Sequence, residues 1–302
     1  MSPIARVTIT LLATSFGLSL PVSGQELQPV SGRAPTEGQQ VVLVTGSTGG
    51  LGREVARILA SRGDHIIVHG RSAERGLELV AEIEAEGRGS ARLYLADLGS
   101  FDEVRALAGA IRRDYPRLDV LLNNAGVWLE GPRRLSNDGH ELHFQVNYLS
   151  GFLLTRELLP LLRQSAPSRI VHVSSVAQQP IDFDNVMLER EYSDGRAYAQ
   201  SKLAQIMLTF DLAEELDGSG VTTNALHPAT MMDTDMVLER SARVRSSVHD
   251  GAAAVMYLID ENDLGSGGYF NQTNPTRANQ QAYDKNTRQR LRALAERLTA
   301  AR

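Results

Sequence analysis

Short apolar runs alternate with longer amphipathic stretches along most of this chain. The short runs are rich in valine, isoleucine and leucine and lie at 41–45, 65–70, 91–97, 118–124, 169–175 and 221–228. Apolar runs of this length are typical of strands that are buried on both faces of a parallel sheet. The longer stretches space their apolar residues as one face of a helix does, at 50–62, 73–86, 102–115, 139–162 and 198–216.

This alternation predicts a single doubly wound α/β domain. A strand, a crossover helix and a second parallel strand form a unit that is right-handed almost without exception. We therefore expect a Rossmann fold over residues 39–302, with about seven parallel strands in one sheet and helices on both faces. No repeat or internal linker interrupts the pattern after residue 40.

The first forty residues follow a different pattern. Residues 7–20 are uncharged and mostly apolar, Arg6 precedes them, and Pro21 and small residues follow. Such a pattern is typical of a secretory signal peptide, and it falls short of the roughly 20 apolar residues of a permanent membrane span. We predict a signal peptide over 1–24 and a polar linker over 25–38; a disordered extension and a misassigned start codon are the alternatives. The leader favours a periplasmic or secreted location, whereas a leader without function favours the cytoplasm.

Composition contributes mainly by exclusion. The 302 residues are 42% apolar and 22% charged, which is ordinary for a globular protein. A net charge of −5 lacks the basic footprint of a nucleic-acid-binding protein, so no nucleic-acid partner is expected. Because the chain has no cysteine, disulfides, thiolate nucleophiles and cysteine-ligated metals are excluded.

The turn after the first predicted strand is rich in glycine. Thr45–Gly52 reads TGSTGGLG and leads directly into a predicted helix. Backbone N–H groups at a helix start bind phosphate, and glycine lets a pyrophosphate approach the backbone. The spacing differs from both the Gly-x-Gly-x-x-Gly fingerprint and the Walker loop, and a purely structural turn is the alternative. The pattern predicts a dinucleotide site at Gly46, Ser47, Thr48, Gly50, Leu51 and Gly52.

The end of the second predicted strand indicates which dinucleotide. An acidic residue at this point favours NAD, but this chain has Gly70 followed by Arg71. Because a guanidinium pairs with a 2′-phosphate, we expect NADP(H) to be preferred; NAD(H), and a solvated surface role for Arg71, are the alternatives. Asp97 and Leu98 end the third strand and are expected near the adenine, although an aspartate there is also a common strand-end cap.

A tyrosine and a lysine stand one helical turn apart in the last long predicted helix. Tyr198 and Lys202 are four residues apart and therefore share a face of that helix. A phenol with a pKa of about 10 is a poor base, and a neighbouring ammonium lowers that pKa. The spacing alone is common by chance, yet Ser175 ends the fifth strand and Asn147 lies on the preceding helix. The four residues together predict a proton-transfer site.

Taken together, these motifs resemble the short-chain dehydrogenase/reductase family over most of the chain beyond residue 40. The glycine turn matches the family's Thr-Gly-x-x-x-Gly-x-Gly element, Asn123–Gly126 its Asn-Asn-Ala-Gly motif, and Val173–Ser175 its catalytic serine. One departure is Ala229, where many members have glycine after proline. The resemblance implies these further cofactor contacts: Asn124, Ala125, Gly126, Tyr198, Lys202, Pro228 and Ala229.

The resemblance also implies a mechanism. Tyr198 would exchange a proton with the substrate oxygen, and Ser175 would hydrogen-bond that oxygen. Lys202 would lower the pKa of Tyr198 and hold the nicotinamide ribose, while Asn147 would fix a water that links Lys202 to solvent. The implied function is hydride transfer between NADP(H) and an alcohol or carbonyl substrate. A carbon–carbon double-bond reductase and a non-catalytic NADP(H)-binding sensor are the alternatives.

Segments 138–147, 182–197 and 268–299 are similar to the retinol-dehydrogenase-like subgroup of that family. This similarity implies alcohols, aldehydes or ketones with bulky apolar bodies as substrates. Flexible methionines can line an apolar pocket, and the chain has three after the sixth strand, although plain packing explains them equally well. They are Met231, Met232 and Met236.

Three further features have weaker signals. His140, Glu141 and His143 lack a further ligand, so we expect no metal. The leucine-rich face of the helix that ends near Leu162 suits the core and a homodimer contact. The arginine-rich carboxyl-terminal helix suits a solvated surface and leaves association with a membrane open.

Overall fold

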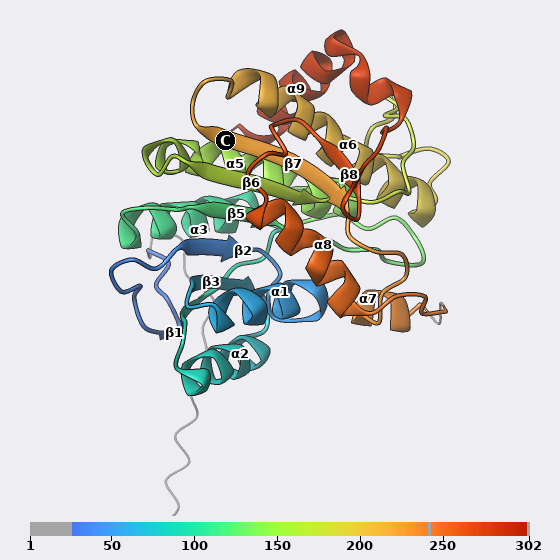
Figure 1. The fold of residues 1–302 in the computed structure, drawn as a ribbon. Helices are drawn as coiled ribbons and strands as arrows, with labels where there is room; N and C mark the ends of the chain where they lie inside the picture. The colour runs from blue at the N-terminus through green and yellow to red at the C-terminus, as the bar shows by residue number, and fades with distance from the viewer. Residues whose placement is uncertain (1–25, 241–242, 301–302) are drawn as a thin grey trace, which may run out of the picture.

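The centre of the molecule is one β-sheet with helices on both faces (Figure 1). The structure is a computed structural model that describes residues 26–240 and 243–300. Its strands are β1 (Ser31–Gly32), β2 (Val41–Val44), β3 (His65–Gly70), β4 (Ser90–Leu95), β5 (Val120–Asn123), β6 (Ser168–Val173), β7 (Val221–His227), β8 (Tyr269–Asn271) and β9 (Asn274–Pro275).

The strand order within these residues is β1-β4-β3-β2-β5-β6-β7-β8-β9. Strands β2 to β8 are parallel, whereas β1 and β9 pair antiparallel at the two edges. The predicted doubly wound α/β sheet is confirmed, and the two short edge strands account for nine strands in place of about seven. The order in which strands are added to the sheet reverses between β2 and β5, and such a switch point opens a crevice at the carboxyl ends of the strands.

The connecting helices follow the predicted pattern closely in the first half of the chain. The longer ones are α1 (Gly50–Ser61), α2 (Ala73–Glu86), α3 (Phe101–Asp114), α5 (Ser150–Gln164), α6 (Asp194–Glu215), α8 (Val248–Asp260) and α9 (Lys285–Thr299). The shorter ones are α4 (Leu142–Phe144), α7 (Asp235–Leu238), the π-helical η1 (Gln145–Leu149) and the 3-10 turn η2 (Gln280–Tyr283).

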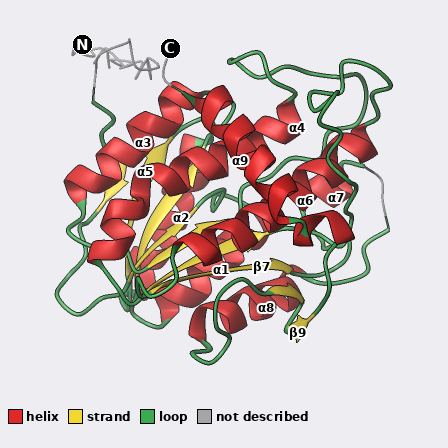
Figure 2. Cartoon of the chain, turned by 90° about the horizontal axis from the view of Figure 1, so that it is seen from above, coloured by secondary structure: helices red, strands yellow, loops and turns green. Residues whose placement is uncertain are grey.

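Two apolar layers cover the sheet. Leu43 of β2 points into the layer beneath α3, α5 and α6, whereas its neighbours Val42 and Val44 point into the layer beneath α1, α2 and α8. Because successive side chains of a strand face opposite sides, a strand buried on both faces must be apolar at every position. Strand β2 meets this requirement, and its four residues are fully buried. Seen from above, α9 lies beside α6 (Figure 2).

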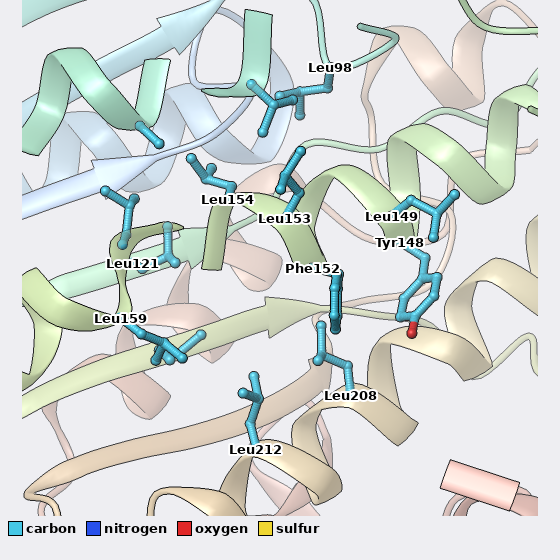
Figure 3. Close-up of a cluster of buried hydrophobic side chains, with 14 of the residues drawn as sticks. Leu98, Leu121, Tyr148, Leu149, Phe152, Leu153, Leu154, Leu159, Leu208 and Leu212 are labelled. Atoms are coloured by element: carbon cyan, nitrogen blue, oxygen red, sulfur yellow. The ribbon is translucent and has the colours of Figure 1, made fainter. Parts of the chain in front are cut away.

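Helices α5 and α6 pack against each other through large apolar side chains (Figure 3). Phe152 and Leu154 of α5 share this cluster with Leu208 and Leu212 of α6. Leu158 and Leu162, which the sequence associates with a homodimer contact, are fully buried within the chain. This leucine-rich face therefore serves the core of one subunit, and a homodimer stays a prediction.

Three elements differ from the sequence-based prediction. The stretch 139–162 is not one helix: α4 begins at Leu142, and a π-helical turn separates it from α5. Helix α6 begins at Asp194, four residues before Tyr198, because the Ser193 hydroxyl caps its first turn by accepting a hydrogen bond from the Arg196 N–H. Helix α8 has no counterpart in the prediction, although Ser247 and Asp250 form a capping box at its start.

The predicted linker over 25–38 also contributes to the sheet. Ser31 and Gly32 pair with Arg92 and Leu93 of β4, and the Arg33 guanidinium donates to the Gly89 carbonyl at 2.9 Å. The exclusion of these residues from the fold is therefore wrong. A strand of two residues was not detectable from the sequence, because its backbone pairing depends on the exposed edge of β4.

The predicted signal peptide over 1–24 lies outside the described residues. Within residues 26–240 and 243–300, no helix combines the length and the apolar character that crossing a bilayer requires. The leader, its cleavage and the location of the protein stay predictions.

We expect Gly32→Ala to destabilise the fold more than Gly38→Ala does. Both glycines have positive φ angles, +98° and +86°, where alanine costs about 1–2 kcal/mol. Only at Gly32 would the added methyl group overlap the Ala91 carbonyl oxygen, whereas nothing lies within 4 Å at Gly38. Urea unfolding should show an additional loss of about 1 kcal/mol for Gly32→Ala. Equal losses would mean that β1 does not hold the edge of the sheet.

Candidate active site

The glycine turn and the turn after β5 are tied together at the carboxyl end of the sheet. The Asn124 side-chain amide donates to the Thr45 carbonyl at 2.8 Å, and the Thr45 hydroxyl accepts from the Asn124 and Ala125 N–H groups at 2.9 and 3.0 Å. A Cβ on Gly52 would overlap the Gly46 carbonyl oxygen and lie 2.5 Å from the Asn124 amide nitrogen. These bonds bring the start of α1 against the end of β5.

One cavity of about 740 Å³ extends from the glycine turn to Tyr198. Most of the residues that the sequence assigns to the cofactor and the substrate line it: Gly46, Thr48, Gly50, Leu51, Gly52, Arg71, Asp97, Leu98, Asn124, Ala125, Gly126, Ser175, Tyr198, Lys202, Pro228 and Ala229.

Two of the predicted site residues do not line this cavity. Ser47 is fully buried, its hydroxyl accepts from the His69 N–H at 3.0 Å, and its own N–H donates to the His69 carbonyl at 2.9 Å. Ser47 therefore holds the turn in shape instead of facing a ligand. Asn147 is likewise buried, with 1% of its surface exposed.

The amide of Asn147 is held by protein groups. Its oxygen accepts from the Val127 N–H at 2.7 Å, and its nitrogen donates to the Val127 carbonyl and the Ser201 hydroxyl. Asn147 lies in the π-helical turn η1, and single π turns inside helices are frequent at functional sites. A Cβ on Gly126 would lie 3.2 Å from the Asn147 oxygen and 3.3 Å from the Lys202 nitrogen. The two side chains therefore converge on Gly126, and the relay water stays a prediction.

Arg71 stands at the open rim of the cavity. Its side chain is 71% exposed, and its nearest acidic partner, Asp97, is 4.0 Å away. One carboxylate oxygen of Asp97 accepts from the Gly99 N–H at 2.9 Å, so Asp97 does cap the end of its strand. Arg75 does not line the cavity: its guanidinium is paired with the Asp235 carboxylate at 2.7 Å and lies 3.6 Å from where a Cβ of Gly49 would be.

Tyr198, Lys202 and Ser175 meet at the carboxyl end of β6. The Lys202 nitrogen lies 5.6 Å from the centre of the Tyr198 ring and donates to the Val173 carbonyl at 2.9 Å and to the Gln205 side chain at 3.0 Å. The Ser175 side chain hydrogen-bonds the Tyr198 phenol. This arrangement places a phenol, an ammonium and a hydroxyl around one point of the cavity.

Burial dominates the electrostatics of this group. It raises the pKa of Tyr198, while the hydrogen bond with Ser175 and the charge of Arg240 act in the opposite direction. Burial also lowers the pKa of Lys202 to about 7. The expected lowering of the Tyr198 pKa is therefore wrong for this structure, since removal from water outweighs the nearby cations. The expected effect of Lys202 on the phenol stays a prediction.

Trp128 is a site residue that sequence reasoning missed. Its ring stacks on the Tyr198 ring with 4.9 Å between the ring centres and an interplanar angle of 21°. Arg240 lies over the same indole, with its guanidinium carbon 3.8 Å from the ring centre. No sequence motif predicts this contact, and the only signal was that Trp128 is the single tryptophan of the chain.

The departure at Ala229 is accommodated without strain. Ala229 is not among the described residues with a positive φ angle, and alanine is unfavourable only in that region. The preceding His227 ring accepts from or donates to the Thr230 hydroxyl at 3.0 Å. Burial, followed by the charge of Lys202, lowers the pKa of His227 to about 4, so the ring is neutral.

The side chains considered for a metal have structural partners. The His143 ring contacts the Glu141 carboxylate at 2.8 Å through one nitrogen and accepts from the Leu129 N–H at 2.9 Å through the other. Both nitrogens therefore support the loop that carries Trp128. In residues 26–240 and 243–300, no three histidine, aspartate or glutamate side chains gather in a way that could hold a metal ion.

The fold and the site together define a dinucleotide-binding Rossmann protein with a Ser–Tyr–Lys centre. Comparison with known families narrows this class. The family model for short chain dehydrogenases matches residues 40–245, and the chain belongs to that family.

Individual relatives agree with this assignment. Human "Retinol dehydrogenase 11" is 43% identical over 195 residues, which are 64% of this chain and 61% of that protein. This chain thus spans about three fifths of the length of the curated relatives it matches. A crystal structure of a "putative uncharacterized protein" from Mycobacterium paratuberculosis has 30% identity and a TM-score of 0.73, covering 89% of this chain and 98% of that one. A short chain dehydrogenase from Burkholderia cenocepacia in complex with NADP has 29% identity and a TM-score of 0.62, covering 77% and 95%.

We expect Gly52→Ala to disrupt the glycine turn, because its methyl group would collide with Gly46 and Asn124. Overpacking of this kind lowers the free energy of unfolding by about 1–3 kcal/mol. The affinity of the Gly52→Ala variant for NADPH should fall at least tenfold. Gly109→Ala is the matched control: Gly109 lies in α3 with nothing within 4 Å of an added Cβ, and alanine there should stabilise by about 1 kcal/mol. NADPH fluorescence and urea unfolding measure both effects. NADPH affinity that is unchanged in Gly52→Ala would contradict the assignment of the turn.

Proposed function

We propose that this protein is an NADP(H)-dependent oxidoreductase that interconverts an alcohol and a carbonyl compound. The observation that carries the proposal is the continuity of one cavity from the glycine turn to the Ser175–Tyr198–Lys202 centre. A cofactor that lies along such a cavity has its phosphates at a helix start and its reactive end beside an acid–base group.

The residues present fit a dinucleotide with a 2′-phosphate. Gly46 and Gly50 have positive φ angles of +66° and +50°, which favour glycine, and without side chains these residues leave the backbone open to a pyrophosphate. Arg71 is exposed and free of any ion pair shorter than 4.0 Å within the described chain, so it is available to a phosphate. The NADP complex of the Burkholderia relative supports the same choice of cofactor.

The protein's own groups supply positions and protons, and the bound nicotinamide would supply the hydride. In the direction of reduction, the Tyr198 phenol donates its proton to the substrate oxygen, and the Ser175 hydroxyl hydrogen-bonds the same oxygen as negative charge develops. The Lys202 side-chain nitrogen lies 5.6 Å from the centre of the phenol ring, where its positive charge favours the ionised form of the phenol. In the direction of oxidation, Tyr198 accepts the proton from the hydroxyl group.

The remaining walls of the cavity favour a substrate with an apolar body. Apolar side chains line it beyond Tyr198, and Trp128 adds a flat aromatic surface. The polar atoms of such a substrate would be confined to the end that meets Ser175 and Tyr198. These apolar walls include Leu135, Leu142, Val146, Val176, Met231, Met232, Met236 and Val237.

Tyr198→Phe should lower the rate of NADPH oxidation with decanal by about 100-fold or more, because it removes the acid. Its affinity for NADPH should stay within about twofold, since the ring and Lys202 remain. Tyr257→Phe, on α8 and outside the cavity lining, is the control and should keep the wild-type rate. Stopped-flow absorbance at 340 nm measures turnover, and an unchanged rate in Tyr198→Phe would refute the proposed role.

Arg71→Ala should weaken NADPH by about 10- to 100-fold, which corresponds to the loss of a charge-assisted hydrogen bond. NADH, which has no 2′-phosphate, should change by less than about twofold. Arg163→Ala removes another exposed arginine, at the end of α5 and away from the cavity lining, and should change neither affinity. Titration calorimetry gives all six constants. A loss of affinity shared equally by the two cofactors would contradict phosphate pairing.

A further inference from the structure

Three side chains from distant parts of the chain stack at the catalytic centre. Tyr198 comes from α6, Trp128 from the loop after β5, and Arg240 from the segment that follows α7. The indole is the shared member, with the Tyr198 ring centre 4.9 Å away and the Arg240 guanidinium carbon 3.8 Å away. The only tryptophan of the protein thus joins a cation to the phenol that the proposed function uses as its acid.

Arg240 is held in this place by more than the indole. Its side chain is only 14% exposed, and its guanidinium lies 3.1 Å from the Asp194 carboxylate and 3.3 Å from that of Glu130. Asp194 opens α6 one turn before Tyr198, and Glu130 lies two residues after Trp128. Each acid therefore anchors Arg240 to the segment that carries one of the other two members of the stack.

The chemistry of the stack suits a guanidinium. A planar, weakly hydrated cation is favoured over an aromatic face, and the attraction increases when water is excluded. One guanidinium nitrogen of Arg240 and the indole nitrogen of Trp128 are buried without a hydrogen-bond partner in the described chain. Burying donors in this way has a cost.

We propose that Arg240 is a positioning residue for Tyr198: it holds Trp128 against the phenol, and its charge favours the ionised form of that phenol. The role rests on the proposed function and extends it to a segment that carries none of the family's motifs. It also makes the site dependent on the 235–240 segment, because the cation reaches the phenol only when that segment lies over the cavity.

The other charges around the phenol act from fixed positions. Lys202 lies on the same helix, 5.6 Å from the ring, and Ser175 supplies a neutral hydrogen bond. Asp194 and Glu130 face the Arg240 guanidinium, and His227 is neutral because burial lowers its pKa. Arg240 is the charge that lowers the pKa of Tyr198 against the effect of burial. Its removal should therefore raise that pKa.

The first test uses Trp128 as its own reporter and needs no activity. Acrylamide quenching of its fluorescence should increase at least twofold in Arg240→Gln, because the guanidinium no longer covers the indole. Arg243→Gln, three residues further along the chain, exposed and without an ion pair in the described chain, is the matched control and should leave quenching unchanged. Quenching that is equal in Arg240→Gln and the wild type would overturn the positioning role.

The second test is the pH profile of decanol oxidation with NADP. Because the ionised phenol is the base in this direction, the rate rises with pH through the Tyr198 pKa. Arg240→Gln should move this rising limb upward by about 0.5–1 pH unit. Arg240→Lys, which keeps the cation and loses the planar stack, should leave the limb in place while lowering kcat. A limb that does not move in Arg240→Gln would overturn the electrostatic role.

The two tests separate the two proposals. If the wild type transfers no hydride with decanol or decanal, the proposed function fails, and quenching alone decides whether Arg240 holds Trp128. A contact that only stabilises the fold would lower the melting temperature of Arg240→Gln without shifting the pH limb, and this result would overturn the role in catalysis. Should Arg240→Gln fail to fold, Arg240→Lys supports the proposal if quenching increases, and overturns it if quenching and kcat both match the wild type.

Discussion

The close approach of the glycine turn to the end of β5 is the contact on which the rest of the site depends. Thr45, Gly46 and Gly52 pack closely around the Asn124 side chain, so that the ends of two parallel strands share one network of hydrogen bonds. This network fixes the start of α1 relative to the floor of the cavity. Asn147 extends the same framework through Val127, which is three residues further along the loop. The glycine turn and the part of the cavity near Asn147 are thereby held in fixed positions relative to each other.

Removal from water acts on both ionisable groups of the candidate site. Burial raises the pKa of Tyr198 and lowers that of Lys202, so both groups are pushed toward their neutral forms. In the proposed reaction a neutral phenol is a ready proton donor, and a nearby positive charge favours the anion needed for the reverse direction. Arg240 and the Ser175 hydroxyl supply that opposing influence. The balance between burial and charge therefore sets which form of the phenol is favoured.

The two halves of the cavity are built differently. The Asn124 side chain, hydrogen-bonded to the Thr45 carbonyl, and the glycine turn shape the half proposed for the cofactor, whereas leucine, methionine and tryptophan side chains shape the other half. Leu135 and Val176 line the cavity and are exposed. Such a surface accepts apolar molecules of varied shape with little directional bonding. This difference explains why the sequence motifs are informative about the cofactor and much less so about the substrate.

Local sequence determined the parallel sheet, the glycine turn and the Tyr198–Lys202 pair, because strand and helix periods and one-turn spacing are properties of neighbouring residues. It did not determine β1, whose two residues have a partner only once β4 presents its edge. Nor did it show that Ser47 faces inward or that removal from water raises the pKa of Tyr198. Only the tertiary structure brings Trp128 onto the phenol and Arg240 onto the indole, because stacking depends on where three segments meet in space.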